Sequence, residues 1–362
     1  MAGRKAEGRR SVGGSSFGQA FKVSTFGESH GGAVGVVVDG ATPGIELCEE
    51  EIQKEMDRRK PGQNSITTPR QEADKIHIMS GVFEGKTTGT PILLILYNED
   101  ARPSAYDDIK DKFRPGHADY TYLRKYGIRD YRGSGRASGR ETAGRVAAGA
   151  IAKKLLARRG VKILAYTLAA AGIKCSSFDA DAIERNPLRA CDMNAAAEME
   201  KKITALQQEK DSAGGIIECR VSGLVPGLGE PVFDKLDAEL AHAMLSLGAV
   251  KGIEFGTGFA AADMTGSEHN DGMDRNGFIT NHAGGILGGI STGAELVFRI
   301  AVKPVSSIAK TQKTVTLSGE ETDISTEGRH DGCICPRIVP VVEAMAAIVL
   351  EDHYKRQAAL LA

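Results

Sequence analysis

A loop rich in arginine and glycine carries the densest chemical signal in the sequence. Residues 127–145 read GIRDYRGSGRASGRETAGR and contain five arginines. Arginine pairs with phosphate or carboxylate through two hydrogen bonds, and glycine lets the backbone approach a ligand closely. The loop leads into a predicted helix whose first N–H groups could bind an anion. We therefore predict an anion-binding site here rather than a solvated basic loop.

Three histidines lie in short polar turns that also contain arginine or acidic residues. His30 lies in GESHGG, His117 in RPGHADY, and His330 in GRHDG beside Asp331. Because the unperturbed pKa of histidine is near neutral, this side chain suits proton transfer at physiological pH. A lone loop histidine is usually structural, but His30 and His117 accompany a predicted anion site. The residues alone thus favour an enzyme that acts on a small ligand with several negative charges.

Four other motifs fail on their context. Residues 27–31 fit the G-x-S-x-G elbow of hydrolases, but a strand rather than a helix is predicted after them. Residues 81–87 are one residue short of a phosphate-binding P-loop and are typical of a hairpin turn. Residues 271–283 lack the charged ligands of a calcium loop, and Cys333 and Cys335 are too close together for a usual zinc site. We therefore expect no metal.

Length and composition limit the class of protein. The chain has 362 residues, with 46 Lys and Arg against 47 Asp and Glu, so a globally basic nucleic-acid-binding protein is excluded. Its 44 glycines make up about 12% of the 362 residues, compared with a usual glycine content of ~7%. Many lie at 27–40, 127–149, 248–258 and 284–293, where we expect contact with ligands. No secretory signal or membrane span is predicted, and six scattered cysteines are typical of reduced thiols in a cytoplasmic protein.

Hydrophobic patterns predict the elements that must position these residues. They indicate strands at 33–38, 76–83, 92–97, 161–167, 216–221 and 295–302, and helices at 47–59, 138–160, 194–211, 234–247 and 338–357. Residues 138–141 (SGRE) fit a capping box that opens the second helix. Since no linker divides the chain, we predict one large α+β or α/β domain at 15–362 after a flexible N-terminal arm at 1–14.

Together these motifs resemble the chorismate synthase family, and only about the first 14 residues lie outside the resemblance. The matching segments are FGESHGG at 26–32, DRRKPGQ at 57–63, SGVFEGKTTGTP at 80–91, RPGHADYTY at 114–122, the whole of 127–156, NHAGGILGGIS at 281–291, KPVSS at 303–307 and GRHD at 328–331. The family implies an α+β fold, a β-α-β sandwich with helices between two antiparallel sheets. It also implies a homotetramer with the site near a subunit interface.

The resemblance implies a reaction that fits the predicted anion site. The family converts 5-enolpyruvylshikimate 3-phosphate to chorismate and phosphate by anti-1,4 elimination, the last common step towards the aromatic amino acids. Reduced FMN is required although there is no net redox change, and NADPH or an external flavin reductase is the implied source of electrons. The substrate carries a phosphate and two carboxylates, so an arginine-rich pocket suits it. No nucleic acid or membrane is expected as a partner.

The family's functional residues carry over by motif. His30 would protonate the leaving phosphate or hold it in the right protonation state, and His117 would protonate the reduced flavin or stabilise its anion. Asp331 would help deprotonate the flavin at N5 as the C6 hydrogen leaves. The residues expected to bind the substrate are Arg59, Arg114, Arg140 and Arg329. The residues expected to contact FMN are Arg136, Ala137, Ser138, Gly248, Ala249, Gly289, Lys303, Pro304, Val305, Ser306, Ser307 and Arg329.

Three positions depart from the family's usual residues. Ala137 stands where serine is common, Gly248 where asparagine is common, and Gly332 where proline usually follows the acid. We expect these changes to remove a hydroxyl and an amide near the flavin and to loosen the turn that aims Asp331. On the residues alone two rival functions stay open. One is a non-catalytic polyanion-binding module that uses 127–145, and the other is a serine hydrolase at Ser29.

Overall fold

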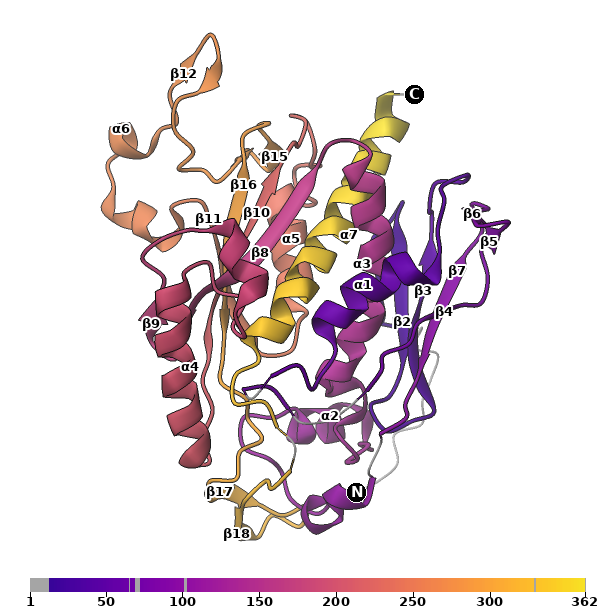
Figure 1. Cartoon of the computed structure of the whole chain (residues 1–362), viewed down its shortest axis with the longest axis vertical. Helices are drawn as coiled ribbons and strands as arrows, with labels where there is room; N and C mark the ends of the chain where they lie inside the picture. The colour runs from indigo at the N-terminus through magenta and orange to yellow at the C-terminus, as the bar shows by residue number, and fades with distance from the viewer. Residues whose placement is uncertain (1–12, 65, 69–71, 101–102, 329, 362) are drawn as a thin grey trace, which may run out of the picture.

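Two antiparallel sheets enclose a layer of helices in the computed structural model (Figure 1), which confirms the α+β sandwich. The structure describes residues 13–64, 66–68, 72–100, 103–328 and 330–361. The first sheet has the order β1-β2-β3-β7-β4. Its strands are β1 (Ser16–Phe17), β2 (Lys22–Gly27), β3 (Ala33–Asp39), β4 (His77–Ile78) and β7 (Ile92–Tyr97).

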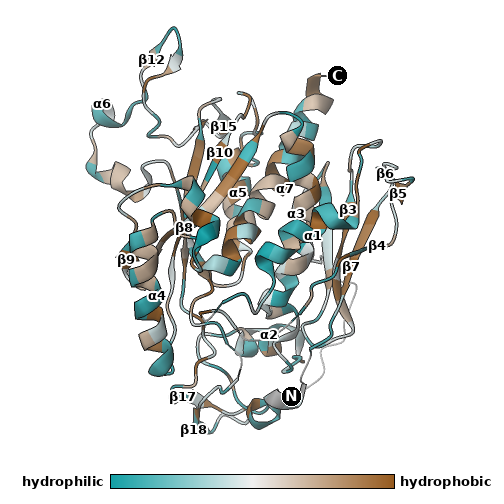
Figure 2. Ribbon diagram, viewed as in Figure 1, coloured by the Kyte–Doolittle hydropathy of each residue, from teal (hydrophilic) through white to brown (hydrophobic). Residues whose placement is uncertain are grey.

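The second sheet has the order β11-β16-β10-β8-β9. Its strands are β8 (Lys162–Ala170), β9 (Ile173–Lys174), β10 (Gly215–Ser222), β11 (Val250–Phe255) and β16 (Leu296–Val302). Both sheets turn one apolar face inward. In β7, for example, Ile92, Leu94 and Leu96 are fully buried at a spacing of two residues, as the pleat of a strand requires. Figure 2 shows this apolar character along β7, β8 and β10.

Four helices pack between the sheets. They are α1 (Glu49–Arg59), α3 (Thr142–Ala157), α5 (Leu236–Leu245) and α7 (Cys335–Leu361). Helix α7 contacts α3, α5 and α1 and is buried almost all round from Cys335 to His353, which explains why its sequence is apolar on every side. Three further helices lie outside this layer (Figure 1): α2 (Asp119–Tyr126), α4 (Met193–Gln208) and α6 (Gly266–His269).

Short hairpins and 3-10 turns complete the described chain. The hairpins are β5 (Val82–Phe83) with β6 (Lys86–Thr87), β12 (Met273–Asp274) with β13 (Gly277–Phe278), β14 (Ile286–Leu287) with β15 (Ile290–Ser291), and β17 (Gln312–Val315) with β18 (Glu321–Ile324). The 3-10 turns are Pro103–Ile109, Gly135–Ala137, Gly139–Glu141, Ala180–Arg185 and Gly258–Asp263. Two predictions are confirmed here, because 81–87 forms a hairpin and β3 follows the serine motif at 27–31.

Two local predictions are wrong. The strand predicted at 76–83 is broken into two short strands, since Gly81 adopts φ +78° and turns the chain between them. The predicted capping box does not form: the Ser138 hydroxyl accepts from the Arg140 amide, while the Glu141 carboxylate accepts from Thr25 and Arg145. A 3-10 turn therefore precedes α3.

The described part of the chain was searched for membrane-spanning helices, metal-binding groups and disulfides. No helix there is long and apolar enough to cross a membrane. No three His, Cys, Asp or Glu side chains there are grouped to hold a metal ion. All six cysteines are free thiols. The N-terminal arm predicted at 1–14 lies almost wholly outside the described residues.

Candidate active site

A cavity of about 1750 Å³ opens where α1 and α5 end and where α3 and α7 begin. Among its described lining residues are ten arginines and lysines but only five acidic residues. The N-terminal ends of α3 and α7 also face it, and helix N-termini favour negative charge. The cavity is therefore suited to an anionic ligand, as the sequence predicts.

Two predicted substrate residues meet on one buried carboxylate. Arg59 ends α1 and Arg140 lies just before α3, and both guanidinium groups form ion pairs with Asp74. Burial would raise the pKa of Asp74, but the two arginines hold it below its usual range. Burial lowers the pKa of Arg59 to about 10, so Arg59 stays charged at pH 7. Asp74 thus holds two cations side by side at the cavity wall.

The turn around His117 is organised by a second buried carboxylate. Asp119, the first residue of α2, accepts two hydrogen bonds of 2.8 Å from the Arg114 guanidinium. Its Oδ1 atom also lies 3.2 Å from Arg129 Nη1. Burial would raise the pKa of Asp119, but Arg114 and His117 keep it well below its usual range. Asp119 is therefore ionised and fixes the side chains around it.

The two nitrogens of His117 have different partners. Nδ1 lies 3.3 Å from Asp119 Oδ1, and Nε2 lies 3.0 Å from Ser134 Oγ. Because Arg114 Nη2 donates to Ser134 Oγ at 2.7 Å, the serine hydroxyl is free to donate to Nε2. Burial lowers the pKa of His117; Asp119 opposes this, and the nearby Arg114 and Lys303 offset only part of its effect, so burial decides the direction. His117 is thus neutral at pH 7, with its proton on Nδ1.

The arginine-rich loop positions both predicted catalytic histidines. Ser134 contacts His117, and the preceding residue, Gly133, lies against the ring of His30. A Cβ atom at Gly133 would stand 2.2 Å from His30 Nδ1, and φ is +59° there, so glycine is required. Tyr106 packs edge-on against the other side of the ring, with centroids 5.2 Å apart. The sequence predictions gave this loop a role in binding anions and flavin, but not in holding these histidines.

Asp331 is held at both carboxylate oxygens. Oδ1 accepts from the Thr68 amide at 2.9 Å, and Oδ2 accepts from Arg337 Nη1 at 2.8 Å. The amide of Gly332 donates to Ile66 at 2.9 Å, a bond that a proline at this position could not make. The turn is therefore supported by other contacts, despite the departure from the family pattern.

The predicted flavin segments 136–138, 248–249 and 303–307 all line this cavity. The Lys303 amide donates to Ala249 at 2.9 Å, and Lys303 Nζ donates to Ser306, which in turn donates to Gly116. Burial lowers the pKa of Lys303, as does the nearby Lys251. Neither lysine pairs with an acidic residue that the structure describes, so this end of the cavity fits a phosphate group.

Not every predicted residue is available to a ligand in this cavity. Gly289 does not line it: its carbonyl accepts from Leu236 at the start of α5, whereas the cavity lies at the other end of that helix. The guanidinium of Arg136 donates to Gly27 and Thr25 on β2. Arg329 lies outside the described residues.

Sequence reasoning missed several residues of the site, namely Asp74, Tyr106, Ser134, Lys251 and Arg337, and it noted Asp119 only as a carboxylate near His117. The partners of Asp74, Tyr106 and Ser134 are distant in sequence, so only the fold brings these residues together. Arg337 offered a weak signal, because it is the one basic residue in the first half of the apolar helix α7. Within one chain the glycine expectation is met only in part. Segment 284–293 does not line the cavity, and Gly149 instead lets α3 pack on Ala344 of α7.

Comparisons with known proteins agree with this geometry. The family model described as chorismate synthase matches residues 21–354. The chorismate synthase of Syntrophobacter fumaroxidans is 56% identical over 339 residues, which cover 94% of this chain and 96% of that protein. The chorismate synthase of Methanosarcina mazei is 55% identical over 352 residues, with coverages of 95% and 96%. A crystal structure of chorismate synthase is similar with a TM-score of 0.75 and 29% identity, covering 94% of this chain and 93% of that chain.

Proposed function

The chain belongs to the chorismate synthase family and is a lyase, and we propose that it converts 5-enolpyruvylshikimate 3-phosphate to chorismate and phosphate in the cytoplasm. The observation that carries the proposal is the charge of the cavity, where ten cationic side chains face five acidic ones. A substrate with one phosphate and two carboxylates would offset most of this excess. The C3–O bond to phosphate breaks and the C6 proton leaves, so electrons and atoms balance without an external oxidant.

We assign the recognition of the substrate's anionic groups to Arg59, Arg114 and Arg140, with Arg337 as a further cation. Asp74 and Asp119 hold three of these guanidinium groups before any ligand arrives. Preorganised donors stabilise developing charge without having to rearrange at the moment of reaction. The carboxylates and the phosphate are already charged in the bound substrate, so here preorganisation should act chiefly on substrate binding.

We assign proton transfer to the three residues named by the family motifs. His30, held by Gly133 and Tyr106, would protonate the leaving phosphate. His117 would face the flavin as a neutral imidazole with its proton fixed on Nδ1 by Asp119. Asp331 would accept the proton that is released when the C6 hydrogen leaves, and Thr68 and Arg337 keep its carboxylate oriented.

FMN is the cofactor that the family implies, and the cavity residues fit it. The volume of about 1750 Å³ accommodates a flavin beside the substrate, and a Cβ at Gly248 would meet no atom within 4 Å. Lys251 and Lys303 would hold the flavin phosphate, while Ser306 and Ser307 offer hydroxyl groups. When bound, reduced FMN supplies an electron-rich ring that assists phosphate loss.

We propose a homotetramer as the working assembly. Gly289 lies at the far end of α5, a helix of ten residues or about 15 Å, from the cavity of its own chain. A flavin contact from Gly289 would therefore be made to a neighbouring subunit. Large apolar side chains are exposed on the same side of the fold, with Phe233 90% and Leu287 47% accessible, as expected of a surface covered by another subunit.

Anaerobic assay with dithionite-reduced FMN tests the proposal. We expect chorismate and phosphate to form in equal amounts, whereas a non-catalytic polyanion-binding module would bind the substrate and release neither. A serine hydrolase would cleave esters, would lose this activity in Ser29→Ala, and would form no chorismate with reduced FMN. Turnover with NADPH as the sole reductant would assign flavin reduction to this chain, and failure under that condition alone would assign it to an external reductase.

A further inference from the structure

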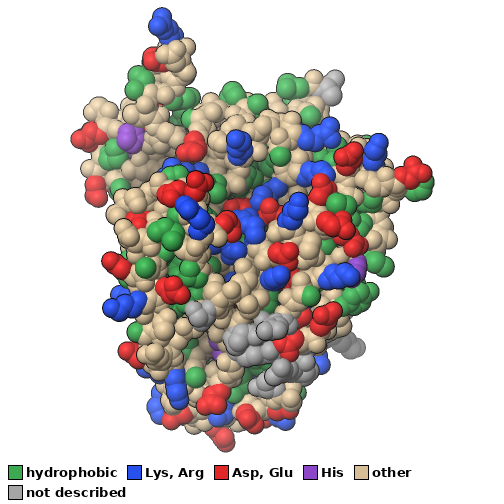
Figure 3. Space-filling model, viewed as in Figure 1, with side chains coloured by type: hydrophobic (Ala, Val, Ile, Leu, Met, Phe, Trp, Pro, Cys, Tyr) green, Lys and Arg blue, Asp and Glu red, His purple; other side chains and the backbone are tan. Residues whose placement is uncertain are grey.

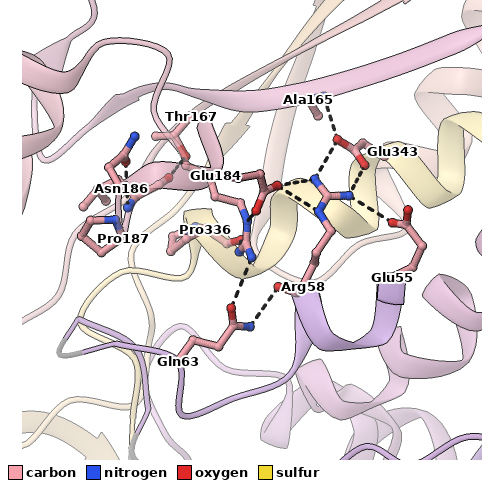
Figure 4. Close-up of polar contacts among 12 residues, drawn as sticks. Glu55, Arg58, Gln63, Ala165, Thr167, Glu184, Asn186, Pro187, Pro336 and Glu343 are labelled. Carbon is pink, nitrogen blue, oxygen red and sulfur yellow. Dashed lines mark hydrogen bonds and ion pairs between the residues drawn. The ribbon is translucent and has the colours of Figure 1, made fainter. Parts of the chain in front are cut away.

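A second group of charged side chains lies behind the active site, on the opposite side of α1. It consists of three acidic and three basic residues, here called the Glu343 cluster: Glu55, Arg58, Lys153, Glu184, Arg189 and Glu343 (Figure 4). None of the six lines the cavity. Figure 3 shows basic and acidic side chains side by side in the hollow at the centre of this face.

Glu343 is the centre of the cluster. It is 1% exposed, and its carboxylate accepts from Arg58, from Lys153 Nζ at 2.9 Å and from the Ala165 amide at 3.1 Å. Burial would raise the pKa of Glu343, but Lys153 and Arg58 hold it at about 2. The carboxylate is therefore ionised and joins α7 to α1, α3 and β8 at one point.

Stability alone is a poor explanation for such a cluster. Removing ions from water costs about as much as their pairing returns, and well-packed apolar residues often stabilise a core better. The best-attested use of buried charges is to fix one arrangement of the elements that carry them. The helices joined here are those whose ends form the cavity wall.

The cluster leads directly to two active-site arginines. Arg58 immediately precedes Arg59, and successive helix residues point about 100° apart, so one side chain faces the cluster and the other faces the cavity. Arg189 donates to the Pro336 carbonyl at 2.6 Å and to Gln63 Oε1 at 3.2 Å. Gln63 donates in turn to the Arg58 carbonyl at 2.9 Å (Figure 4). Pro336 precedes Arg337.

We propose that Glu343 is a positioning residue for substrate binding. Its cluster clamps the last turn of α1 against the first turns of α7 and thereby sets the positions of Arg59 and Arg337. This inference rests on the proposed function, in which these arginines hold the substrate's anionic groups. Glu343 itself touches neither substrate nor cofactor, so it acts through α1 and α7.

The test compares Glu343→Gln with Glu351→Gln on the same helix. Glu351 is equally buried and pairs with Arg159 and Lys355, but it is two turns further from the cavity. Both variants remove one buried charge with little change in shape. In the anaerobic assay we expect Glu343→Gln to raise KM for the enolpyruvyl substrate about 10-fold with less than about 3-fold change in kcat, while Glu351→Gln leaves both constants unchanged.

Binding and folding measurements separate positioning from general damage. Calorimetry with oxidised FMN present should show about 10-fold weaker substrate binding in Glu343→Gln only, although urea unfolding should show that both variants are destabilised. Equal effects on KM, or no effect in Glu343→Gln, would overturn the inference. If the wild-type chain neither binds nor turns over the substrate, the proposed function fails instead.

A milder variant keeps the test decisive if Glu343→Gln does not fold. Gln63 is exposed, and Gln63→Ala removes the link between Arg189 and the Arg58 carbonyl together with one hydrogen bond to the Lys60 carbonyl. We expect KM to rise about 3-fold with unchanged kcat and unchanged urea unfolding. An unaltered KM in Gln63→Ala would contradict the clamp.

Discussion

The cavity and the Glu343 cluster are both built from buried charges on the same helices, yet their charge balance differs. The described cavity lining has twice as many basic as acidic residues, whereas the Glu343 cluster has three of each. In a balanced cluster the positive and negative side chains neutralise one another, so the cluster can hold helices in place without a ligand. An unbalanced one needs an anion to complete it. This difference, rather than the number of arginines, distinguishes a binding site from a scaffold.

Removing one cation from the unbalanced side should have the largest effect. Arg140→Met would leave Asp74 paired with Arg59 alone, which cancels part of the charge that the substrate needs. We expect kcat/KM to fall about 1000-fold, within the range for truncating one partner of a buried charged pair. Arg159→Met, which breaks a pair with Glu351 far from the cavity, serves as the control in the same steady-state assay. Similar losses in both variants would contradict the distinction.

Removing a proton-transfer group should have the next largest effect. We expect His117→Ala to lower kcat about 100-fold, the usual size of one general acid–base contribution. His77→Ala, a histidine on the first sheet that lies near Glu49, should leave kcat unchanged. Asp119→Asn should reproduce part of the His117 loss, because the proton on Nδ1 would no longer face a carboxylate. An Asp119→Asn enzyme with wild-type kcat would remove the orienting role of Asp119.

Stability at acidic pH should report the burial of His330 beside the cations of the cavity. Burial lowers the pKa of His330 to about 4, and the nearby Arg114 adds to this effect. In the unfolded chain the pKa is about 6.5, so between these values the unfolded state binds a proton that the folded state refuses. Stability should therefore fall as pH drops below about 6.5, by about 2 kcal/mol at pH 5. Urea unfolding of His330→Gln at pH 7 and pH 5 should show a smaller fall than the wild type, and parallel curves would contradict it.

An exposed, paired arginine at the cavity rim should have the smallest effect. Arg132 pairs with Asp130 at 2.9 Å and its side chain is 45% exposed, so its charge is already matched and screened by water. We expect Arg132→Ala to change KM less than about 2-fold in the anaerobic assay. A large increase in KM would show that substrate binding depends on the total number of arginines in this loop and not on those whose charge is unmatched.

The sequence predicted the elements of the site better than their partnerships. Hydrophobic periodicity located α1, α3 and β7, because long buried elements carry a repeating pattern. The structure also brings the arginine-rich loop and the turns of His30 and His117 together at one cavity. The sequence did not predict the buried carboxylate that holds Arg140, because Asp74 and Arg140 are 66 positions apart and no local motif indicates such a pair.

Other misses have equally local causes. The capping box at 138–141 failed because Glu141 finds stronger partners in Arg145 and Thr25, so tertiary contacts replaced the local hydrogen bond. The five glycines at 284–293 were expected to contact a ligand, but they lie away from the cavity of their own chain, and all five adopt positive φ in the turns around β14 and β15. Glu343 stands out in the sequence as an acidic residue inside an apolar helix. Its partners could not be predicted, because they lie on three other elements.

Affinity for the substrate with and without its phosphate tests the central claim most directly. Calorimetry on the wild-type chain with oxidised FMN would compare 5-enolpyruvylshikimate 3-phosphate with the analogue that lacks the phosphate. If the unmatched cations of the cavity exist to hold this anion, the phosphorylated compound should bind about 100-fold more tightly, or about 2.7 kcal/mol. Equal affinities would contradict the account, because the excess of cations would then have no part in recognising the substrate.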